Sequence, residues 1–436
     1  MMLNRRELLG GMSLPVGASL LPGLIWPQTS RAMGAVKELA ATPGAPHEIA
    51  QNEDFWQEVR AAFTPDNSLI NLQSGGVSPS PRVVQESMKR MLDYSNTTPT
   101  YTMWEILWPQ LETVRKRLAR EWGVDPEEIA ITRGASEGLQ ICQNGIDLKA
   151  GDEVLTTNQD YVRMIWTYHQ RERREGIVLK QISIPTPCED PAIVVQRFRE
   201  AITPRTKIMH VSHMINLSGQ ILPVREVADL AHEHGLPFIV DGAHSMAHID
   251  FKLPDLGCDY YATSLHKWLF APHGTGLLYV RRDRIKGHWA LQAPPEELDS
   301  NIRKFEEIGT CPVANPLAIG DALTFHQGLG SLRKQARLNY LREYWMNRLR
   351  KFDQIHWNTS QKPGMACGIG NFDVKGSDLE VLNQWLFDKR GIVTHVTHHP
   401  EYNGVRVTPN VFTTLDELDR FCDAVEAGLR EGIGAG

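Results

Sequence analysis

The sequence has no excess of positive charge, and it is poor in cysteine. Its 436 residues include 46 Lys and Arg against 52 Asp and Glu, a formal net charge of −6. Nucleic-acid-binding domains usually carry a basic face, so the composition gives no support to a nucleic-acid partner. The six cysteines show no C-x-x-C pair and no metal-ligand spacing, so we expect no metal site. Buried free thiols are the interpretation we favour, with one or more disulfides still open, at the scattered positions Cys142, Cys188, Cys258, Cys311, Cys367 and Cys422.

The N-terminal part of the sequence has an apolar stretch that is too short for a membrane span but typical of an export signal. A spanning helix needs about 20 predominantly apolar residues, and the uncharged stretch from Gly10 to Trp26 is shorter and rich in Gly and Pro. It follows Arg5-Arg6 and precedes small residues between Ser30 and Ala35. This order is typical of a secretory signal, and the paired arginines indicate the twin-arginine route. We predict that residues 1–35 are a twin-arginine signal peptide and that the protein works in the periplasm. A chance Arg-Arg before an amphipathic helix is the alternative.

The remaining chain has two patterns of predicted elements. From about Glu128 to Arg281, short apolar runs alternate with amphipathic stretches. We expect strands at 129–132, 152–156, 208–211, 238–241 and 276–280. Helices are expected at 136–144, between the second strand and residue 171, and at 224–234. This alternation is typical of a mostly parallel sheet with helices on both faces. After a partly helical segment at about 316–352, a smaller α+β domain is predicted by strands near 370–372, 391–393 and 405–407 and helices at 379–389 and 415–429.

Two motifs follow predicted strands, at the edge where open α/β sheets bind ligands. In Thr132–Glu137, a turn of small residues opens a helix, where backbone N–H groups and the Ser136 hydroxyl can approach a phosphate. An N-cap role for Ser136 is the alternative. In Asp241-Gly-Ala-His244, the carboxylate can pair with the protonated nitrogen of a pyridine cofactor, or it can cap a helix instead.

Two further motifs contain isolated basic residues. In Ser264-Leu-His-Lys-Trp268, a lysine among apolar and aromatic neighbours should lose its proton easily, as imine formation with an aldehyde requires. A lysine that ends a strand and is merely exposed is the alternative. Arg406, between β-branched residues, offers a bidentate fork to a substrate carboxylate, or forms a surface salt bridge.

Together and in this order, the four motifs resemble pyridoxal-5′-phosphate (PLP) enzymes of fold type I. More narrowly, the chain resembles class V aminotransferases, in the branch of isopenicillin N epimerase-like proteins and cysteine desulfurases, from about Leu72 to Phe421. The most specific stretches are Asp241–His244, Ser264–Lys267 and Gly274–Val280. The resemblance implies an α/β fold with a mostly parallel, seven-stranded-type sheet. It also implies a signal peptide (1–35), an N-terminal segment (36–75), a large PLP-binding domain (76–312), and a linker helix with a small C-terminal α+β domain (313–436).

The resemblance also implies roles around the cofactor ring. Lys267 matches the lysine that holds PLP as a Schiff base, and Asp241 matches the partner of the pyridine nitrogen. His244 matches the residue that hydrogen-bonds the phenolic oxygen of the cofactor. Asn216 resembles another contact beside the ring, and Tyr161 occupies the place of the aromatic residue or histidine that stacks on it.

At the two ends of the cofactor, further positions match. Arg406 matches the arginine that binds the substrate carboxylate. Thr310 resembles a residue that reaches the phosphate of the neighbouring subunit, which implies a homodimer. The phosphate is expected at the turn of Gly134 and at the matching positions Ala135, Ser136, Ser264 and His266.

The sequence departs from the desulfurases in the segment before Arg406. Desulfurases carry a mobile catalytic cysteine on the loop there, whereas residues 397–404 form a short predicted loop without cysteine. We therefore do not expect desulfurase chemistry. His398 and His399 in this loop are candidates for acid–base groups, or they make loop contacts only.

The shared chemistry of the family leaves several reactions open. We expect Arg406 to orient an amino acid whose Cα proton Lys267 removes, and transamination, epimerisation or elimination can follow. The chain is similar to the twin-arginine-exported PLP enzymes that act on the glutamyl group of pyoverdine-type siderophores. Such export carries folded proteins and suits an enzyme that acquires its cofactor first. The alternatives are an epimerase or carbon–sulfur lyase acting on a small amino acid, and a non-catalytic binding protein without PLP.

Overall fold

The computed structural model describes residues 39–434, so the predicted signal peptide at residues 1–35 lies outside the described part of the chain. The main sheet contains β2 (Ile129–Thr132), β3 (Glu153–Thr157), β4 (Val178–Ile182), β5 (Thr206–Ser212), β6 (Phe238–Asp241), β7 (Tyr260–Ser264) and β8 (Gly276–Val280). Their order is β2–β8–β7–β6–β5–β3–β4. Strand β8 is antiparallel to both neighbours, and the other pairs are parallel. The predicted α/β fold with a mostly parallel seven-stranded sheet is confirmed.

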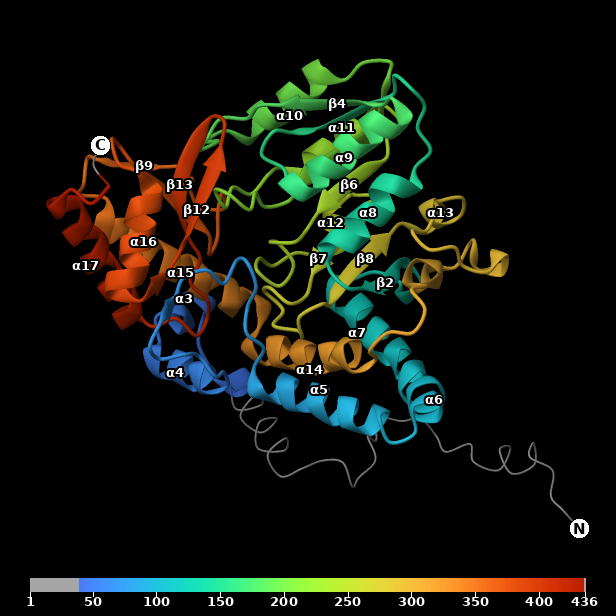
Figure 1. Ribbon diagram of the computed structural model, residues 1–436, viewed down its shortest axis with the longest axis horizontal. Coiled ribbons are helices and arrows are strands. Elements are labelled where there is room, and N and C mark those ends of the chain that lie inside the picture. Colours follow the sequence, from blue (N-terminus) through green and yellow to red (C-terminus); the bar gives the residue numbers. More distant parts are fainter. Residues whose placement is uncertain (1–38, 435–436) are drawn as a thin grey trace, which may run out of the picture.

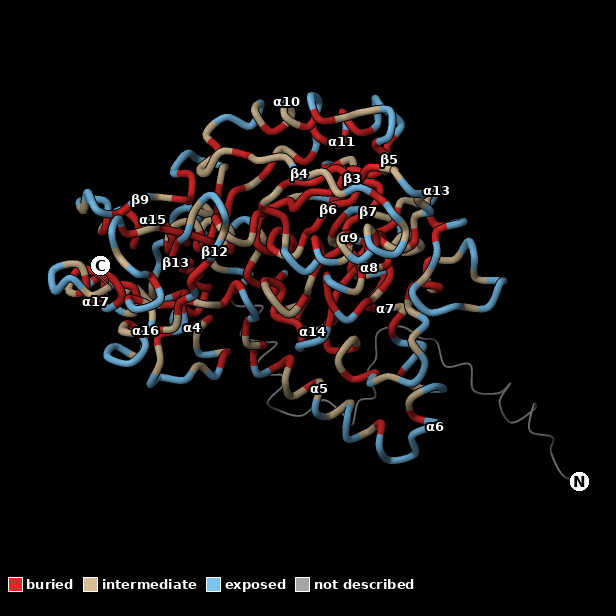
Figure 2. Tube along the Cα trace, turned by 45° about the horizontal axis from the view of Figure 1, so that its top comes forward, coloured by how far each residue is buried: buried red, intermediate tan, exposed pale blue. Residues whose placement is uncertain are grey.

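Helices cover both faces of this sheet. One face packs against α8 (Ala135–Gly145) and α9 (Val162–Glu175), and these helices share an apolar cluster with the strands. The opposite face packs against α10 (Pro191–Ala201), α11 (Val224–Glu233) and α12 (Leu253–Leu256), which belong to a second cluster. Figure 2 shows the strands as largely buried segments inside the more exposed outer helices. The prediction omitted β4, because Lys180 and Gln181 interrupt its apolar run and the strand lies partly exposed at the sheet edge.

The C-terminal part contains a separate four-stranded antiparallel sheet. Its order is β12 (His395–His399), β13 (Tyr402–Val407), β10 (Gly370–Val374) and β9 (Ile355–Trp357), with α16 (Leu379–Arg390) and α17 (Leu415–Glu431) against it. The expected loop at 397–404 is wrong, because these residues form a tight hairpin of β12 and β13 with only Pro400 and Glu401 between the strands. The predicted strand near 391–393 is β11 (Ile392–Val393), which pairs with β1 (Ile70–Asn71) rather than with this sheet.

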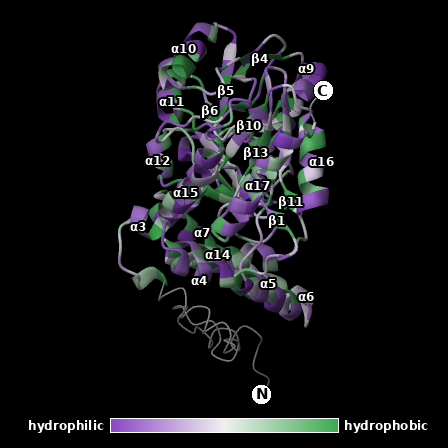
Figure 3. Cartoon of the chain, turned by 90° about the vertical axis from the view of Figure 1, so that its left-hand side faces the viewer, coloured by the Kyte–Doolittle hydropathy of each residue, from purple (hydrophilic) through white to green (hydrophobic). Residues whose placement is uncertain are grey.

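Long helices link the two sheets along one side of the molecule (Figure 1). The expected partly helical segment at 316–352 is two helices, α14 (Ala314–Leu329) and α15 (Ser331–Leu349), because Gly330 has a φ of 81° that interrupts the helix. Helix α14 packs on α5 (Arg82–Ser95) and α7 (Leu111–Trp122), and α15 packs on α3 (Pro46–Ala50). Hydrophilic and hydrophobic residues mix along outer helices such as α5 and α16 (Figure 3). The domain boundaries at 75/76 and 312/313 stay predictions.

The remaining elements are short. They are α4 (Glu53–Ala61), α6 (Pro99–Tyr101), the π-helix η1 (Thr102–Leu107), the 3-10 helices η2 (Trp108–Gln110), η3 (Pro126–Glu128), η4 (Glu296–Leu298) and η5 (Ile302–Glu306), and α13 (Arg282–Ile285). No helix between residues 39 and 434 is long and apolar enough to cross a membrane. All six cysteines are free thiols, five of them buried and Cys311 partly exposed.

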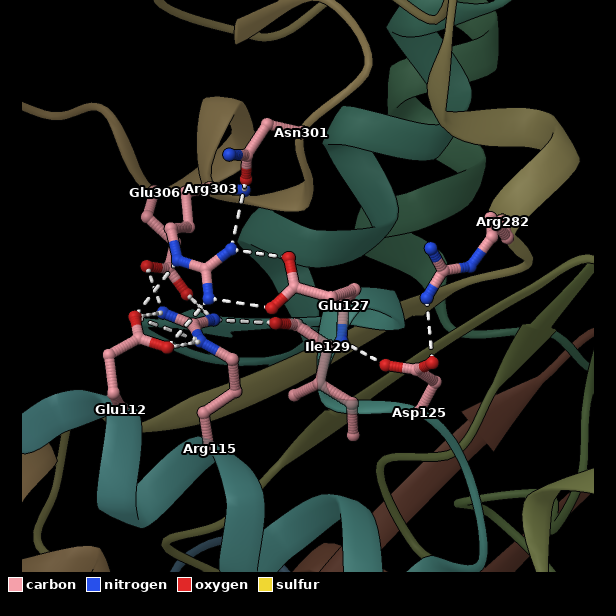
Figure 4. A network of polar contacts seen from close by, with 9 residues as sticks. All are labelled: Glu112, Arg115, Asp125, Glu127, Ile129, Arg282, Asn301, Arg303 and Glu306. Atoms are coloured by element: carbon pink, nitrogen blue, oxygen red, sulfur yellow. Dashed lines mark hydrogen bonds and ion pairs between the residues drawn. The ribbon is translucent and has the colours of Figure 1, made fainter.

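A network of ion pairs ties η5 to the start of β2 (Figure 4). Arg115, on α7, lies 2.5 Å from Glu306 and donates to the carbonyl of Ile129. Arg303 bridges Glu112 and Glu127, and its hydrogen bond to Glu112 holds the pKa of that carboxyl down at about 2. The network therefore fixes the segment that leads to Thr310 against the strand that precedes α8.

Candidate active site

A cavity of about 410 Å³ lies where the carboxyl ends of β5, β6 and β7 meet the first turn of α8. This is the edge at which an open α/β sheet binds its ligand. Ten predicted site residues line it together: Gly134, Ala135, Ser136, Tyr161, Asn216, Asp241, His244, Ser264, His266 and Lys267.

The first turn of α8 forms one end of the cavity. Gly134 is the N-cap of the helix, so the alternative of an N-cap role for Ser136 is wrong, and Ser136 lines the cavity instead. The Ala135 N–H donates to the Ser264 hydroxyl at 3.0 Å, and the next N–H groups of this turn have no acceptor within the helix. A Cβ on Gly276 of β8 would lie 2.5 Å from Gly134, so only glycine allows this close approach. Unpaired N–H groups at a helix N-terminus suit a phosphate.

Lys267 lines the cavity, shortly after β7. The cavity leaves its side chain partly exposed, but protein atoms surround Nζ closely enough for desolvation to dominate. The pKa of Lys267 falls from 10.5 to about 8, mainly because of desolvation; the charge of Asp241 opposes the shift, and the positive charge of Arg406 adds to it. A larger share of the amine is therefore neutral near pH 7, which is the form that attacks an aldehyde.

Asp241 ends β6 and faces the same cavity. One carboxylate oxygen accepts the Ala243 N–H at 2.9 Å, and the side chain forms no ion pair within residues 39–434. Residues 243–248 form turns and no helix begins directly after Asp241, so the alternative of a helix-capping role is wrong. Burial raises the pKa of Asp241 to about 6, while Ala243 and Lys267 lower it. A buried carboxylate without a contacting cation fits a protonated ring nitrogen.

His244, Tyr161 and Asn216 line the same cavity as Lys267 and Asp241. His244 Nε2 lies 3.0 Å from Lys267 Nζ. Burial, and then the charge of Lys267, hold the pKa of His244 well below its usual value of 6.5, so its ring is neutral. Tyr161 precedes α9 and lines the cavity, while Asn216 accepts a hydrogen bond through its backbone carbonyl.

Arg406 extends toward the site from β13 of the small sheet. Nη1 donates to the Asn216 carbonyl at 2.8 Å and Nη2 to the Gln73 side chain at 3.1 Å, while buried Nε has no partner among the described residues. Burial lowers the pKa of Arg406 to about 10, which still leaves it charged at pH 7. Because it is buried and forms no salt bridge with a carboxylate of the described chain, the surface salt-bridge alternative is wrong. An arginine in this state suits a substrate carboxylate.

The other predicted residues lie apart from the cavity. Thr310 is exposed and does not line it, so its reach into a neighbouring subunit stays a prediction. His398 is exposed and lies 2.8 Å from Glu380, whereas His399 Nε2 lies 3.0 Å from the Asn158 carbonyl. Neither histidine lines the cavity, and each contacts a residue outside the hairpin, so the choice between an acid–base role and a structural contact stays a prediction.

Sequence reasoning missed part of the supporting structure. Asp160 is buried and accepts the Ser212 N–H at 2.6 Å, which joins the segment before Tyr161 to the end of β5. Its position after β3 was the available signal. Gln73, which orients Arg406, carries no local signal because the two residues are far apart in the chain.

Comparison with known proteins places this site in a family. The family model described as aminotransferase class-V matches residues 70–421. Isopenicillin N epimerase of Streptomyces clavuligerus is 28% identical over 389 residues, covering 85% of this chain and 98% of that protein. A probable cysteine desulfurase of Halalkalibacterium halodurans is 26% identical, covering 82% of this chain and 92% of that protein.

Solved structures agree on the fold. The apo structure of cysteine desulfurase from Thermococcus onnurineus gives a TM-score of 0.74 at 21% identity, covering 87% of this chain and 98% of that one. A mutant of C-DES with glycine covalently linked to its PLP cofactor gives a TM-score of 0.73 at 21% identity, covering 83% and 98%. The fold and site are those of a PLP-dependent enzyme of fold type I. The chain belongs to the class V aminotransferase family.

The residues present fit PLP and define what each can do. When bound, PLP supplies an electron sink for negative charge that develops at Cα of an amino acid. The α8 turn would hold the phosphate, and Asp241 would keep the ring nitrogen protonated. Arg406 would bind the substrate carboxylate, and Lys267 Nζ, freed by the substrate amine, would accept the Cα proton.

Proposed function

We propose that this protein is an exported PLP-dependent enzyme that removes the Cα proton of an amino-acid moiety in an aminotransferase-type reaction. The observation that carries this proposal is a buried, charged Arg406 beside the cavity of Lys267 and Asp241, without a carboxylate partner in the described part of the chain. The α-carboxylate of an amino acid supplies the missing negative charge and orients Cα toward Lys267.

The experiment is to incubate the PLP-loaded protein with single amino acids in D₂O and follow both Cα–H exchange and release of the 2-oxo acid. The proposal expects exchange that is lost in Lys267→Ala. Exchange with stoichiometric 2-oxo acid indicates transamination. If neither exchange nor 2-oxo acid appears with any amino acid or amino-acid conjugate, the proposed reaction is wrong.

The absence of cysteine from the β12–β13 hairpin and from the lining of the cavity supports a reaction other than desulfuration. Neither strand of the β12–β13 hairpin carries a cysteine, and none of the residues that line the cavity is one. The buried thiols have raised pKa values, since desolvation raises that of Cys367 to about 12. A thiol in this state is a weak nucleophile.

As the more specific form of this proposal, the substrate is the glutamyl group of a pyoverdine-type siderophore in the periplasm. The signal-like residues 1–35 and the similarity to exported enzymes of that kind support it. Deletion of the gene should change the mass profile of the secreted siderophore, and an unchanged profile contradicts this substrate. Fractionation of cells that carry Arg5→Lys and Arg6→Lys tests export, which should fail in that variant.

Two alternatives have observations of their own. Similarity to isopenicillin N epimerase over 98% of that protein favours epimerisation, which would show as Cα–H exchange with inversion and no 2-oxo acid. A carbon–sulfur lyase is suggested by the fold that the chain shares with C-DES, a cystine C–S lyase. It would release sulfide or pyruvate from cysteine derivatives, and no release across such a panel removes it.

A homodimer is part of the proposal, because Thr310 lies exposed outside the cavity of its own subunit. If Thr310 holds the phosphate of its neighbour, Thr310→Ala alone should bind PLP more weakly. Mixing it with Lys267→Ala should then restore one native site in each hybrid dimer. A monomer in sedimentation, or no restoration in the mixture, contradicts this arrangement.

A further inference from the structure

Behind Lys267 and His244, three buried side chains form a layer that does not line the cavity. They are Trp268, His248 and Lys334, all nearly inaccessible to solvent. The His248 ring stacks on the Trp268 indole with centroids 3.6 Å apart and an angle of 24° between the planes. This layer touches His244 from the side opposite to Lys267, so it is placed to control the histidine.

The direction of each hydrogen bond at His248 follows from its partners. Its Nε2 faces the Gly368 backbone N–H at 2.8 Å, and a backbone N–H only donates, so Nε2 is the acceptor. Its Nδ1 faces the His244 carbonyl at 2.8 Å, and a carbonyl only accepts, so Nδ1 carries the proton. Both nitrogens of His248 are therefore satisfied in one tautomer, and the ring is fixed against Trp268.

The same reasoning fixes His244. The Trp268 Nε1–H lies 3.4 Å from His244 Nδ1, and an indole nitrogen only donates, so Nδ1 is the acceptor. Burial keeps the ring neutral, so its single proton is on Nε2. That N–H points at Lys267 Nζ, 3.0 Å away, and the amine accepts this hydrogen bond in its neutral form.

The backbone around this layer is held in uncommon conformations. Ala247, next to His248, and Phe270, two residues after Trp268, have φ values of 59° and 65°, which non-glycine residues rarely adopt. Lys334 donates to the Trp268 carbonyl, and its Nζ lies 3.9 Å from the centroid of the Phe270 ring. Such conformations persist only where the surroundings hold them, and they concentrate at functional sites.

We propose that Trp268 is a positioning residue that holds His244 in the Nε2–H tautomer, so that the imidazole donates a hydrogen bond toward Lys267 and toward the cofactor bound there. A histidine in the other tautomer would accept at this position and would repel the phenolic oxygen. The proposal concerns the residues that hold the cofactor, and it is independent of which amino acid is the substrate.

The first test measures the tautomer in the wild-type protein. We expect ¹⁵N spectra of histidine-labelled protein, with and without PLP, to show His244 protonated at Nε2 and unprotonated at Nδ1. A His244→Gln sample identifies the signals. A proton on Nδ1 of His244 in either form overturns the proposal, whatever the behaviour of any variant.

The second test uses Trp268→Phe, which keeps an aromatic ring against His248 but removes the N–H donor. The visible absorption of the bound cofactor is titrated with pH. The titratable and charged groups that act on His244 are Lys267, Arg406 and His248, and Trp268 faces its Nδ1. We expect the midpoint to rise by about 0.5–1 unit, the size expected for one lost hydrogen bond that acts on one protonation state. The rise follows because a phenolic oxygen without its donor keeps more negative charge beside the protonated nitrogen at Lys267.

The matched control is Trp345→Phe. The Trp345 indole is also buried, but its Nε1 has no partner within the described chain, and it packs in the small domain. We expect the control to leave the midpoint unchanged and the Trp268→Phe spectrum to show His244 in mixed tautomers. Equal midpoints in Trp268→Phe and Trp345→Phe overturn the proposal.

Discussion

The cofactor end and the substrate end of the site are built in different ways. At the cofactor end, residues of a single sheet and its first crossover meet, between Gly134 and Lys267. At the substrate end, Arg406 of the small sheet is held by Gln73 from the N-terminal segment and by the carbonyl of Asn216. Most of the cavity for the cofactor is therefore lined by one continuous stretch of the large sheet and its connections, whereas the carboxylate group of the substrate would be bound where three remote segments meet.

The charges differ in the same way. Burial moves the pKa values of Asp241 and Lys267 toward each other, to about 6 and about 8. Both side chains therefore gain or lose a proton near neutral pH. Arg406 stays charged at neutral pH and forms no ion pair with a carboxylate of residues 39–434. The cofactor end is thus organised for proton transfer, and the substrate end supplies a fixed positive charge.

The largest effect is expected at the cofactor end, from Lys267→Ala. Cα–H exchange should fall by roughly 10³-fold or more, because the base is lost together with the covalent anchor. Circular dichroism should show an unchanged fold. The exposed Lys207→Ala is the matched control and should keep full activity.

The second largest effect is expected from Asp241→Asn. Its kcat should fall by roughly 10²–10³-fold, because an amide does not stabilise a protonated ring nitrogen. Bound PLP should remain detectable in this variant. Activity within a few fold of the wild type would contradict the assignment of Asp241 as the partner of the ring nitrogen.

At the substrate end, Arg406→Gln should raise KM by about 10–100-fold, the size of a lost hydrogen bond between charged groups, with PLP affinity unchanged. A raised KM with unchanged PLP affinity would show that the substrate end can be altered without affecting the cofactor end. Loss of PLP binding in Arg406→Gln would show that the two ends are not separate.

The rate of PLP uptake by the cofactor-free protein should depend on the neutral fraction of Lys267. Since burial lowers its pKa to about 8, the rate should rise with pH up to about 8 and then level off. Below that value it should fall about tenfold per pH unit, because the protonated amine does not attack the aldehyde. A rise that continues to pH 10 would indicate an unshifted lysine.

The smallest effects are expected in the β12–β13 hairpin. His399→Gln removes a contact to the Asn158 carbonyl and should raise KM by about 2–10-fold, as for one neutral hydrogen bond. His398→Gln is the matched control, because His398 is exposed and pairs with exposed Glu380, so this substitution should leave KM unchanged. Equal effects of the two substitutions on KM would show that the contact between His399 and Asn158 does not contribute to substrate binding.

The same comparison explains how much the sequence predicted. The cofactor end was predictable because each residue sits directly after an apolar strand, as Asp241 does after Phe238–Val240, and the strand ends of one sheet meet at one edge. Strand β2 was predicted with its observed bounds for the same reason.

The substrate end was less predictable, because its geometry depends on contacts that are remote in sequence. The hairpin at 397–404 was mistaken for a loop, since its histidines and Pro400 lack the alternation of a half-buried strand. Gln73 and the Trp268 layer were missed because nothing local indicates that they contact Arg406 and His244.

The most direct test of the central claim is borohydride reduction of the PLP-loaded protein, followed by digestion and mass spectrometry. The account predicts a yellow protein whose visible band is bleached by the reduction, with the pyridoxyl group on the peptide that contains Lys267. A colourless protein that takes up no PLP, or a pyridoxyl group on another lysine, would contradict it. The first of these results would favour the non-catalytic binding protein instead.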